Sequence, residues 1–294
     1  MELSQILEQS QPRVSRHLKL LTEAGLVERF PDGAWMFYRL AAHGPRRALL
    51  DKALSLTDGD DPELARDQAR LERVRGDRLE TAADYFARNA AHWNTLRSLY
   101  VAEVDVEAAI LQAVGPGPFD QLVDLGTGAG RMLTLLGERA RHAIGLDLSQ
   151  QMLNVARSLT GEAGLSHCEL RHGDIFATRL PDAFADLVVV HQVLHYLSDP
   201  AGALAEAGRL VRPGGRLLVV DFAPHRLEYL REAHQHRRLG FSDAEIQRGF
   251  ELAGLEPAEQ TTLPPADEHG LTVKIWTAAR HSEPLRAESH RNVA

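Results

Sequence analysis

The sequence predicts an α/β protein in which a mainly parallel sheet follows a small helical segment that carries a β-hairpin. Residues 119–280 alternate short apolar runs with amphipathic stretches, the order expected of strands joined by crossover helices. A glycine-rich run directly follows the first apolar run of that region. Residues 1–57 have a different pattern, which predicts helix, turn, helix, hairpin and helix.

Composition narrows the class of protein. The 294 residues are enough for two domains, and a hydrophobic content of 44% supports a substantial core. We find no apolar run of about 18 residues and no signal-peptide pattern, so we expect a cytoplasmic protein that does not enter a membrane. A single cysteine, Cys168, excludes a disulfide framework and a thiolate cluster within one chain, and we expect no bound metal.

We divide the chain into four segments. Residues 1–57 form a small domain, residues 58–118 a helical connector or lid, residues 119–280 the sheet domain, and residues 281–294 a polar, disordered tail. Residues 1–57 hold eight Lys and Arg against six acids, a charge of +2. Because the whole chain carries −8, the remainder carries −10, so a mildly basic head precedes an acidic body.

The second helix of the head has the pattern of a helix that enters the major groove of DNA. Its apolar residues Val14, Leu18 and Leu21 share one face, and Gly25 ends it. Polar and basic side chains lie away from that face, where they could reach base edges and phosphates. The expected DNA contacts are Gln11, Arg13, Ser15, Arg16, His17 and Lys19 of this helix, with Arg29 after it.

A hairpin is predicted directly after this helix. Two apolar-rich runs, LVERF and AWMFYRL, are joined by Pro31-Asp32-Gly33, and Asp-Gly between strands is a strong hairpin signal. Such a hairpin would be a wing that lies along the DNA backbone. The alternative is that helix and hairpin merely pack together, but the order of the elements favours DNA binding.

The string SQPRVSRHLKLLTEAGLVERFPDGAWMFYRL resembles the winged helices of ArsR/SmtB-type bacterial repressors. The resemblance covers about residues 3–57 and implies a homodimer that binds operator DNA. Such repressors have two further helices before this point, so we expect either a misassigned start or an incomplete head. Their metal sensors use cysteine pairs or His/Asp sets, whereas the last helix here offers only His43 and Asp51, so metal sensing is not expected.

A nucleotide-type site is predicted at the start of the sheet domain. The glycine-rich run 126–130 follows the apolar run 122–125, a turn that lets a ligand approach the backbone. The next apolar run ends in Asp147, whose carboxylate is suited to bonding both hydroxyls of a ribose. NAD is a competing ligand, but an acid after the third strand, Asp174, and the Arg-Pro-Gly-Gly turn at 212–215 argue against it.

The motifs VDLGTGAGR, GLDLS, HGDI, DLVVVHQVLHYL and LVRPGGRLLVVDF look like the successive motifs of class I S-adenosylmethionine (SAM) methyltransferases. The resemblance spans roughly residues 80–280 and is strongest to small-molecule enzymes of the quinone-modifying kind. It implies a Rossmann-like sheet, SAM as cofactor, and a lid that includes Tyr85, Phe86 and Trp93. The implied cofactor contacts are Asp124, Gly126, Thr127, Gly128, Gly130, Asp147, Leu148, Met152, Gly173, Asp174, Ile175, His191 and Gln192.

Catalytic candidates follow the fourth strand. His191, His195 and Tyr196 stand where such methyltransferases face their acceptor, and each could act as a base or orient the acceptor. The alternative is that His195 and Tyr196 simply cap and pack a helix start. Three further histidines, His225, His234 and His236, are expected on a solvated, cationic helix face rather than around a metal, although their segment could also shape an acceptor pocket.

Two functions remain open from the sequence. The first is a transcriptional regulator that couples operator binding to SAM or S-adenosylhomocysteine (SAH), because fusion of two ligand sites permits reciprocal coupling. The second is an active SAM-dependent methyltransferase of a small molecule, with a vestigial or targeting head. We favour the first, and the sequence does not name the methyl acceptor.

Overall fold

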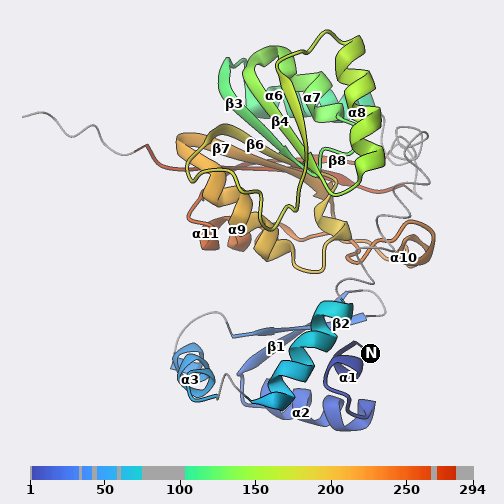
Figure 1. The fold of residues 1–294 in the computed structure, drawn as a ribbon, viewed down its shortest axis with the longest axis vertical. Coiled ribbons are helices and arrows are strands. Elements are labelled where there is room, and N and C mark those ends of the chain that lie inside the picture. Colours follow the sequence, from blue (N-terminus) through green and yellow to red (C-terminus); the bar gives the residue numbers. More distant parts are fainter. Residues whose placement is uncertain are drawn as a thin grey trace, which may run out of the picture. The chain divides into compact units, whose positions relative to one another are not determined.

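The computed structural model describes residues 2–32, 35–41, 45–57, 61–74, 103–265 and 270–282. These residues belong to two compact units, Met1–Asp84 and Tyr85–Ala294, and each unit is described by itself (Figure 1). The expected lid residues Tyr85, Phe86 and Trp93 lie outside the described residues. Residues 283–294, nearly all of the expected disordered tail, also lie outside the described residues.

The first unit contains the predicted succession of helices and hairpin. Its elements are α1 (Glu2–Ile6), α2 (Gln11–Glu23), β1 (Val27–Asp32), β2 (Trp35–Leu40) and α3 (Pro45–Leu54), and residues 62–74 are also helical. The strands β1 and β2 pair antiparallel, with Val27 opposite Leu40. Gly25 has a φ of 67° and ends α2 as predicted, because that left-handed backbone suits a residue without Cβ.

The core of the first unit is small. Val14 is buried at 6% exposure, but Leu21, predicted on the same apolar face, is 38% exposed. The helix of residues 62–74 is held to α1 through Arg70, whose Nε donates to the carbonyl oxygen of Ile6 at 2.6 Å. The guanidinium of Arg70 also pairs with Glu8 at 2.8 Å, so polar contacts join this helix to the segment around α1.

The second unit contains a seven-stranded sheet in the order β5-β4-β3-β6-β7-β9-β8. Five parallel strands, β3 to β7, form most of it, and β9 joins antiparallel to β7. The strand order reverses between β3 and β6, a switch point at which ligands bind outside the carboxyl ends of the strands. The strands are β3 (Phe119–Leu125), β4 (Ala140–Asp147), β5 (Cys168–His172), β6 (Ala185–His191), β7 (Val211–Phe222), β8 (Glu256–Leu263) and β9 (Val273–Ala279).

Helices cover both faces of this sheet (Figure 1). One face carries α9 (Pro200–Leu210) and α11 (Asp243–Leu252), and the other carries α6 (Glu103–Val114) and α7 (Arg131–Leu136). Alternate residues of β6 serve the two cores: Leu187 and Val189 pack toward α6 and α7, whereas Val188 faces the core of α9 and α11. This two-sided burial explains why β6 is a continuous apolar run. Two further helices are α8 (Gln150–Glu162) and α10 (Tyr229–Ala233).

The Arg-Pro-Gly-Gly motif differs from its prediction as a turn that precedes the strand. It lies within β7, which already begins at Val211 opposite Ala185. The next pair joins Leu187 to Arg216, so the four residues 212–215 are accommodated as an irregularity in the ladder. The amide of Gly214 donates to the carbonyl oxygen of Arg280 at 2.9 Å, which fixes this bulge against the segment after β9.

Candidate functional site

The glycine-rich loop lies between β3 and α7, at the switch point of the sheet. The φ angles of Gly126, Gly128 and Gly130 are 73°, 51° and 80°. A Cβ at Gly126 would lie 2.5 Å from Cγ2 of Val193, so both the backbone angle and the space require glycine. The amides of Gly126 and Thr127 both donate to the carbonyl oxygen of Leu146 at 2.8 Å, which holds the loop against the end of β4.

Asp147 ends β4 and forms the centre of the expected ribose site. Its Oδ2 accepts from the Gly128 amide and its Oδ1 from the Ser149 amide, both at 2.8 Å. Burial raises the pKa of this carboxyl above its ordinary value of 3.8, although the two backbone donors act in the opposite direction. The result is a fixed, desolvated acceptor, which suits hydroxyl donors.

Asp124 at the end of β3 and Thr127 of the loop, both in the predicted cofactor set, are buried. Asp124 is 1% exposed and Thr127 is 6% exposed. The hydroxyl of Thr127 donates to Oδ2 of Asp124 at 2.6 Å. This bond joins the end of β3 to the glycine-rich loop.

The residues implied for the adenine differ in exposure. Asp174 and Ile175 follow β5. The amide of Gly173 donates to the carbonyl oxygen of Asp147 at 3.1 Å, so the end of β4 is held beside the segment that follows β5. Leu148 is 40% exposed, whereas Met152 is 2% exposed and packs against Ala129.

Sequence reasoning did not identify Phe176. It is 36% exposed directly after Ile175, and its amide donates to Oδ1 of Asp174 at 3.0 Å. The sequence signal that could have identified it is an aromatic residue directly after two implied adenine contacts. A flat apolar side chain at this place is suited to the face of a base.

A cleft opens at the carboxyl end of β6. His191 and Gln192 line it, together with Met132 of α7. Gln192 has a φ of 53°, and its amide donates to the carbonyl oxygen of Val220 at 2.7 Å, so the turn after β6 is fixed to β7. Five lining residues were not foreseen: Met132 of α7, Glu103, Val106 and Glu107 of α6, and Val273 of β9.

The other catalytic candidates are not in that cleft's lining. His195 is 1% exposed, and its Nδ1 lies 2.8 Å from Oδ1 of the buried Asp221. Its ring contacts Tyr196 and His236 at centroid separations of 4.0 Å and 4.2 Å. Among the described residues, Nε2 of His195 has no hydrogen-bond partner.

The expectation of a solvated histidine face is wrong for His236. This side chain is 3% exposed, and burial drives its pKa far below the ordinary value of 6.5, so the ring is neutral. The cause is that residues 223–242 fold back over the 3₁₀ turn Leu194–Tyr196. The amides of Arg237 and Arg238 donate to the carbonyl oxygen of His195 at 2.8 Å and 3.1 Å. His234 is half-buried and His225 lies 6.4 Å from His236 between ring centroids.

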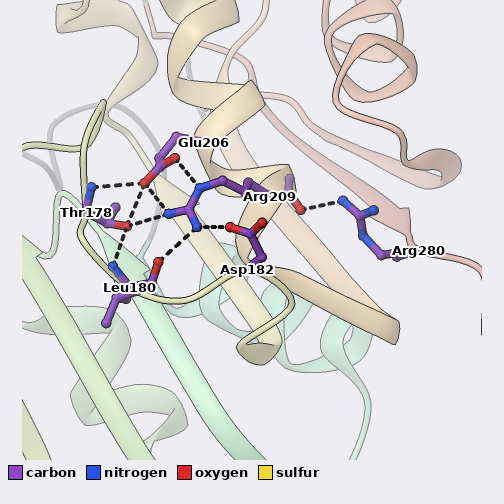
Figure 2. Close-up of polar contacts among 7 residues, drawn as sticks. Thr178, Leu180, Asp182, Glu206, Arg209 and Arg280 are labelled. Atoms are coloured by element: carbon purple, nitrogen blue, oxygen red, sulfur yellow. Dashed lines mark hydrogen bonds and ion pairs between the residues drawn. The ribbon is translucent and has the colours of Figure 1, made fainter.

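A polar network anchors the loop that follows Asp174 (Figure 2). Glu206 of α9 accepts from both the amide and the hydroxyl of Thr178, at 2.9 Å and 2.6 Å. Arg209, one turn later, pairs with Glu206 and donates to the carbonyl oxygen of Leu180 at 2.9 Å. These bonds lower the pKa of Glu206 to about 2, the side-chain bond from Arg209 being the largest cause.

The first unit gathers part of the predicted DNA-contact set. All six predicted residues of α2 are exposed, and Arg29 of β1 is exposed as well. Ser15, Lys19 and Arg29 line one groove with Tyr38 of β2. The groove therefore carries two basic side chains, those of Lys19 and Arg29, and it lies between α2 and the hairpin. Its other lining residues are Thr22 and Glu23.

Two parts of the chain match models of known protein families. Residues 123–219 match the family model of a methyltransferase domain, and residues 1–29 match that of the arsR family of bacterial regulatory proteins. The chain is 34% identical over 156 residues to malonyl-[acyl-carrier protein] O-methyltransferase of Serratia marcescens, covering 53% of this chain and 58% of that protein. It is 29% identical over 153 residues to ubiquinone biosynthesis O-methyltransferase of Aeromonas salmonicida, covering 46% and 62%.

A solved structure shows the same fold. Geranyl diphosphate C-methyltransferase of Streptomyces coelicolor A3(2), determined with Mg²⁺, geranyl diphosphate and SAH, matches with a TM-score of 0.52 at 17% identity. That match covers 61% of this chain and 79% of the other. The chain covers between 33% and 65% of the first three curated relatives that it matches.

Residues 123–219, which match the model of a methyltransferase domain, include the glycine-rich loop and most of the parallel strands of the sheet, and these similarities support SAM as the cofactor. In this chain the domain is joined to an N-terminal segment that matches arsR-family helix-turn-helix proteins. The residues present fit the cofactor, because Asp147 beside the glycine-rich loop provides a carboxylate acceptor that the amides of Gly128 and Ser149 hold in place. No helix among the described residues is long and apolar enough to cross a membrane.

Proposed function

We propose that the protein is a SAM-binding transcriptional regulator that couples operator binding by the N-terminal head, residues 1–57, to SAM or SAH binding in residues 119–280. The observation that carries the proposal is the presence, in one chain, of two candidate ligand surfaces. One is the exposed basic face of α2 with its groove to Arg29, and the other is the glycine-rich loop with Asp147. A ligand that prefers one arrangement of the head changes DNA affinity by the same factor as DNA changes ligand affinity.

The proposed DNA contacts divide into two kinds. Gln11, Ser15 and His17 are suited to base edges because their side chains donate and accept hydrogen bonds, whereas Arg13, Arg16, Lys19 and Arg29 provide charge for phosphates. The net charge of +2 on residues 1–57 supports binding in spite of the acidic remainder.

The proposed DNA-binding form is a homodimer, since paired half-sites fit a two-fold protein. Apolar side chains of the first unit support this assembly. Leu49 and Leu54 on α3 are 61% and 51% exposed, and Leu56 after it is 75% exposed. A second copy of this chain would cover them, and sedimentation of the full chain at several concentrations measures this association.

The test of coupling is operator binding by the full chain at fixed ionic strength. Fluorescence anisotropy with the DNA upstream of its own gene is measured without ligand, with saturating SAM and with saturating SAH. We expect at least one ligand to change the dissociation constant about tenfold, which is about 1.4 kcal/mol of coupling. Asp147→Asn is the matched control and should bind DNA without responding to ligand. Equal operator affinity in all three conditions contradicts the proposal.

Active methyl transfer is the second candidate, and the pairing of His195 with Asp221 favours it. If Nδ1 of His195 donates to Asp221, Nε2 is left as a proton acceptor. SAM supplies an electrophilic methyl group: the bond from sulfur to methyl breaks, the acceptor forms the new bond, and its proton passes to a base. His191 in the cleft, His195 and Tyr196 are the proposed base or orienting groups.

Transfer of labelled methyl from SAM into a metabolite extract tests this second function. A labelled product that disappears with His191→Ala would support it, provided that the variant still binds SAM. If no extract gave a labelled product, the domain would bind SAM without transferring its methyl group.

A further inference from the structure

The loop between β5 and β6, residues 173–184, is fixed to α9 by the three residues Thr178, Glu206 and Arg209, which we call the clamp (Figure 2). Oε1 of Glu206 accepts from both the amide and the hydroxyl of Thr178, at 2.9 Å and 2.6 Å. Nε and Nη2 of Arg209 donate to the two carboxylate oxygens of Glu206 at 2.7 Å, which orients that acceptor. Nη1 of Arg209 donates to the carbonyl oxygen of Leu180 at 2.9 Å. The clamp therefore holds the loop at two places, one on each side of residue 179.

The same loop carries the residues implied for the adenine. Ile175, Thr178 and Leu180 are buried, and Ile175 and Leu180 pack in the same apolar core as α9. Phe176 lies between these buried positions and is exposed. The loop is thus held from within, and Phe176 is left accessible to a ligand.

Asp174 keeps one carboxylate oxygen for a ligand. Its Oδ1 accepts from the Phe176 amide at 3.0 Å, and its backbone carbonyl oxygen accepts from the Ala177 amide at 3.1 Å. No donor among the described residues bonds to Oδ2 of Asp174. The two bonds close a tight turn that ends directly before Thr178. The position of Asp174 therefore depends on where the clamp holds Thr178.

The backbone inside the clamp has an uncommon conformation. Arg179 has a φ of 59°, in the left-handed region that residues with a Cβ adopt at a cost. Such a conformation persists where neighbouring contacts determine it. The two neighbours of Arg179 are Thr178 and Leu180, which the clamp bonds. The clamp therefore determines the path of the loop at this point.

The edge of adenine matches the group that the clamp positions. Adenine carries an exocyclic amino group, which donates hydrogen bonds and suits a carboxylate oxygen such as Oδ2 of Asp174. Hypoxanthine carries a carbonyl oxygen at the same place, and an acceptor there is repelled by the carboxylate. A site built to accept from an amino group discriminates against a ligand that lacks it, but only when the acceptor stays within hydrogen-bond distance.

We propose that Thr178, Glu206 and Arg209 are positioning residues that give the cofactor site its preference for adenine, because they hold Asp174 where it accepts from the amino group of the base. The three residues act through the β5–β6 loop rather than by touching the ligand. The inference rests on the proposed SAM site and specifies how the chain recognises the base of its ligand.

A purely structural clamp gives a different result. If the clamp only stabilises the fold, its loss weakens the binding of adenine and hypoxanthine ligands by the same factor. If it positions Asp174, its loss weakens the binding of the adenine ligand more. The ratio of the two dissociation constants is therefore the decisive quantity, because it cancels general damage to the fold.

The experiment is isothermal titration of the full chain with SAM, SAH and S-inosylhomocysteine, which differs from SAH only in carrying hypoxanthine instead of adenine. The variants are Glu206→Gln, Thr178→Val, which removes the hydroxyl at nearly constant volume, and Thr178→Ser, which retains it. Glu169→Gln is the matched control, because Glu169 forms an exposed pair with Arg171 at 2.7 Å on β5. Melting temperatures of all these proteins identify a variant that fails to fold.

We expect the native protein, Thr178→Ser and Glu169→Gln to bind SAH at least about tenfold more tightly than S-inosylhomocysteine, the effect of one hydrogen bond to a charged group. Glu206→Gln and Thr178→Val should reduce that preference severalfold. Equal binding of the two ligands by the native protein, or an unchanged ratio in both clamp variants, overturns the inference but leaves the cofactor site intact. Failure of the native protein to bind SAM and SAH overturns the proposed function as well.

Discussion

The side chains of His195 and Asp221 form a buried pair where β6 and β7 end, with Nδ1 of the imidazole 2.8 Å from Oδ1 of the carboxylate. The same carboxylate accepts from the backbone amides of His195 at 3.3 Å and Phe222 at 2.8 Å. Three donors thus converge on one side chain of 0% exposure. The pair joins the turn after β6 to the end of β7.

Asp221→Asn tests the structural weight of this pair. The amide offers one acceptor oxygen and brings two new donors into a group that already contains three. A buried donor left without an acceptor costs about 1–3 kcal/mol, so we expect a loss of that size in the free energy of unfolding. Urea denaturation of the second unit measures it. Asp120→Asn, an exposed acid paired with Arg141, should change stability by less than about 0.5 kcal/mol.

SAM affinity should fall as the pH is lowered through the range in which Asp147 becomes protonated. Burial raises the pKa of this carboxyl, so it protonates at a higher pH than an ordinary aspartate and then no longer accepts from ribose hydroxyls at both oxygens. The stability of the unliganded protein changes in the opposite direction. A raised pKa means that the folded state binds this proton more tightly, so protonation of Asp147 favours folding as pH falls.

Calorimetric titration of SAM at a series of pH values measures the first effect, and thermal unfolding without ligand measures the second. Asp147→Asn removes both dependences. A native affinity that stays constant down to the ordinary aspartate range would contradict the role given to this carboxyl.

Glu206 should contribute to acid stability. Its folded pKa of about 2 lies below the ordinary 4.5, so its stabilisation is complete above pH 4.5 and is lost as pH falls toward 2. The shift corresponds to at most about 3 kcal/mol, and the side chain is only 12% exposed. Denaturation at pH 7 and pH 3 should show a smaller loss of stability for Glu206→Gln than for the native protein. Parallel losses would show that the pair with Arg209 is not formed in solution.

Two glycine substitutions should have opposite effects. Gly126→Ala forces a φ of 73° on an L-residue and places a methyl 2.5 Å from Val193, so we expect lost SAM binding and reduced stability. Gly161→Ala near the end of α8 meets no atom within 4 Å and should be neutral or stabilising by up to about 1 kcal/mol. SAM titration and thermal melts compare them. If the Gly126→Ala variant still bound SAM, the cofactor site would have to lie elsewhere in the protein.

Arg29→Gln should weaken operator binding and alter its response to salt. A lost phosphate contact releases about one counterion fewer, so the slope of log affinity against log salt should fall in magnitude by about 1. Anisotropy at four salt concentrations gives that slope. Arg47→Gln on α3, where Arg47 pairs with Asp51, is the control and should leave the slope unchanged. A slope unaffected by Arg29→Gln would remove this residue from the DNA interface.

The fold of the second unit could be predicted because local patterns agreed with one another. The run Leu122–Leu125 ends β3, and the predicted helix after it begins at Arg131 as observed. The positive φ angles of Gly126 and Gly128 could likewise be foreseen from their place between strand and helix. These features depend on residues close together in the sequence.

Contacts between distant segments escaped prediction. Nothing in the sequence of Glu103 or Glu107 indicates a meeting with Arg131, more than 20 residues later. The burial of His236 was missed because it depends on the fold-back of residues 223–242 over His195. Apolar periodicity identifies strands and helices, but it does not determine which loop covers another.

The position of β9 has a consequence for the order in which the protein is made and folded. This strand lies between β7 and the edge strand β8, although it is the last strand of the sheet to be synthesised. Until residue 279 has left the ribosome, the side of β7 that pairs with β9 has no partner strand. By then β1 and β2 of the first unit, which pair with each other, have already been synthesised. The first unit can therefore fold during translation, but the second unit completes its sheet only after synthesis has passed that strand.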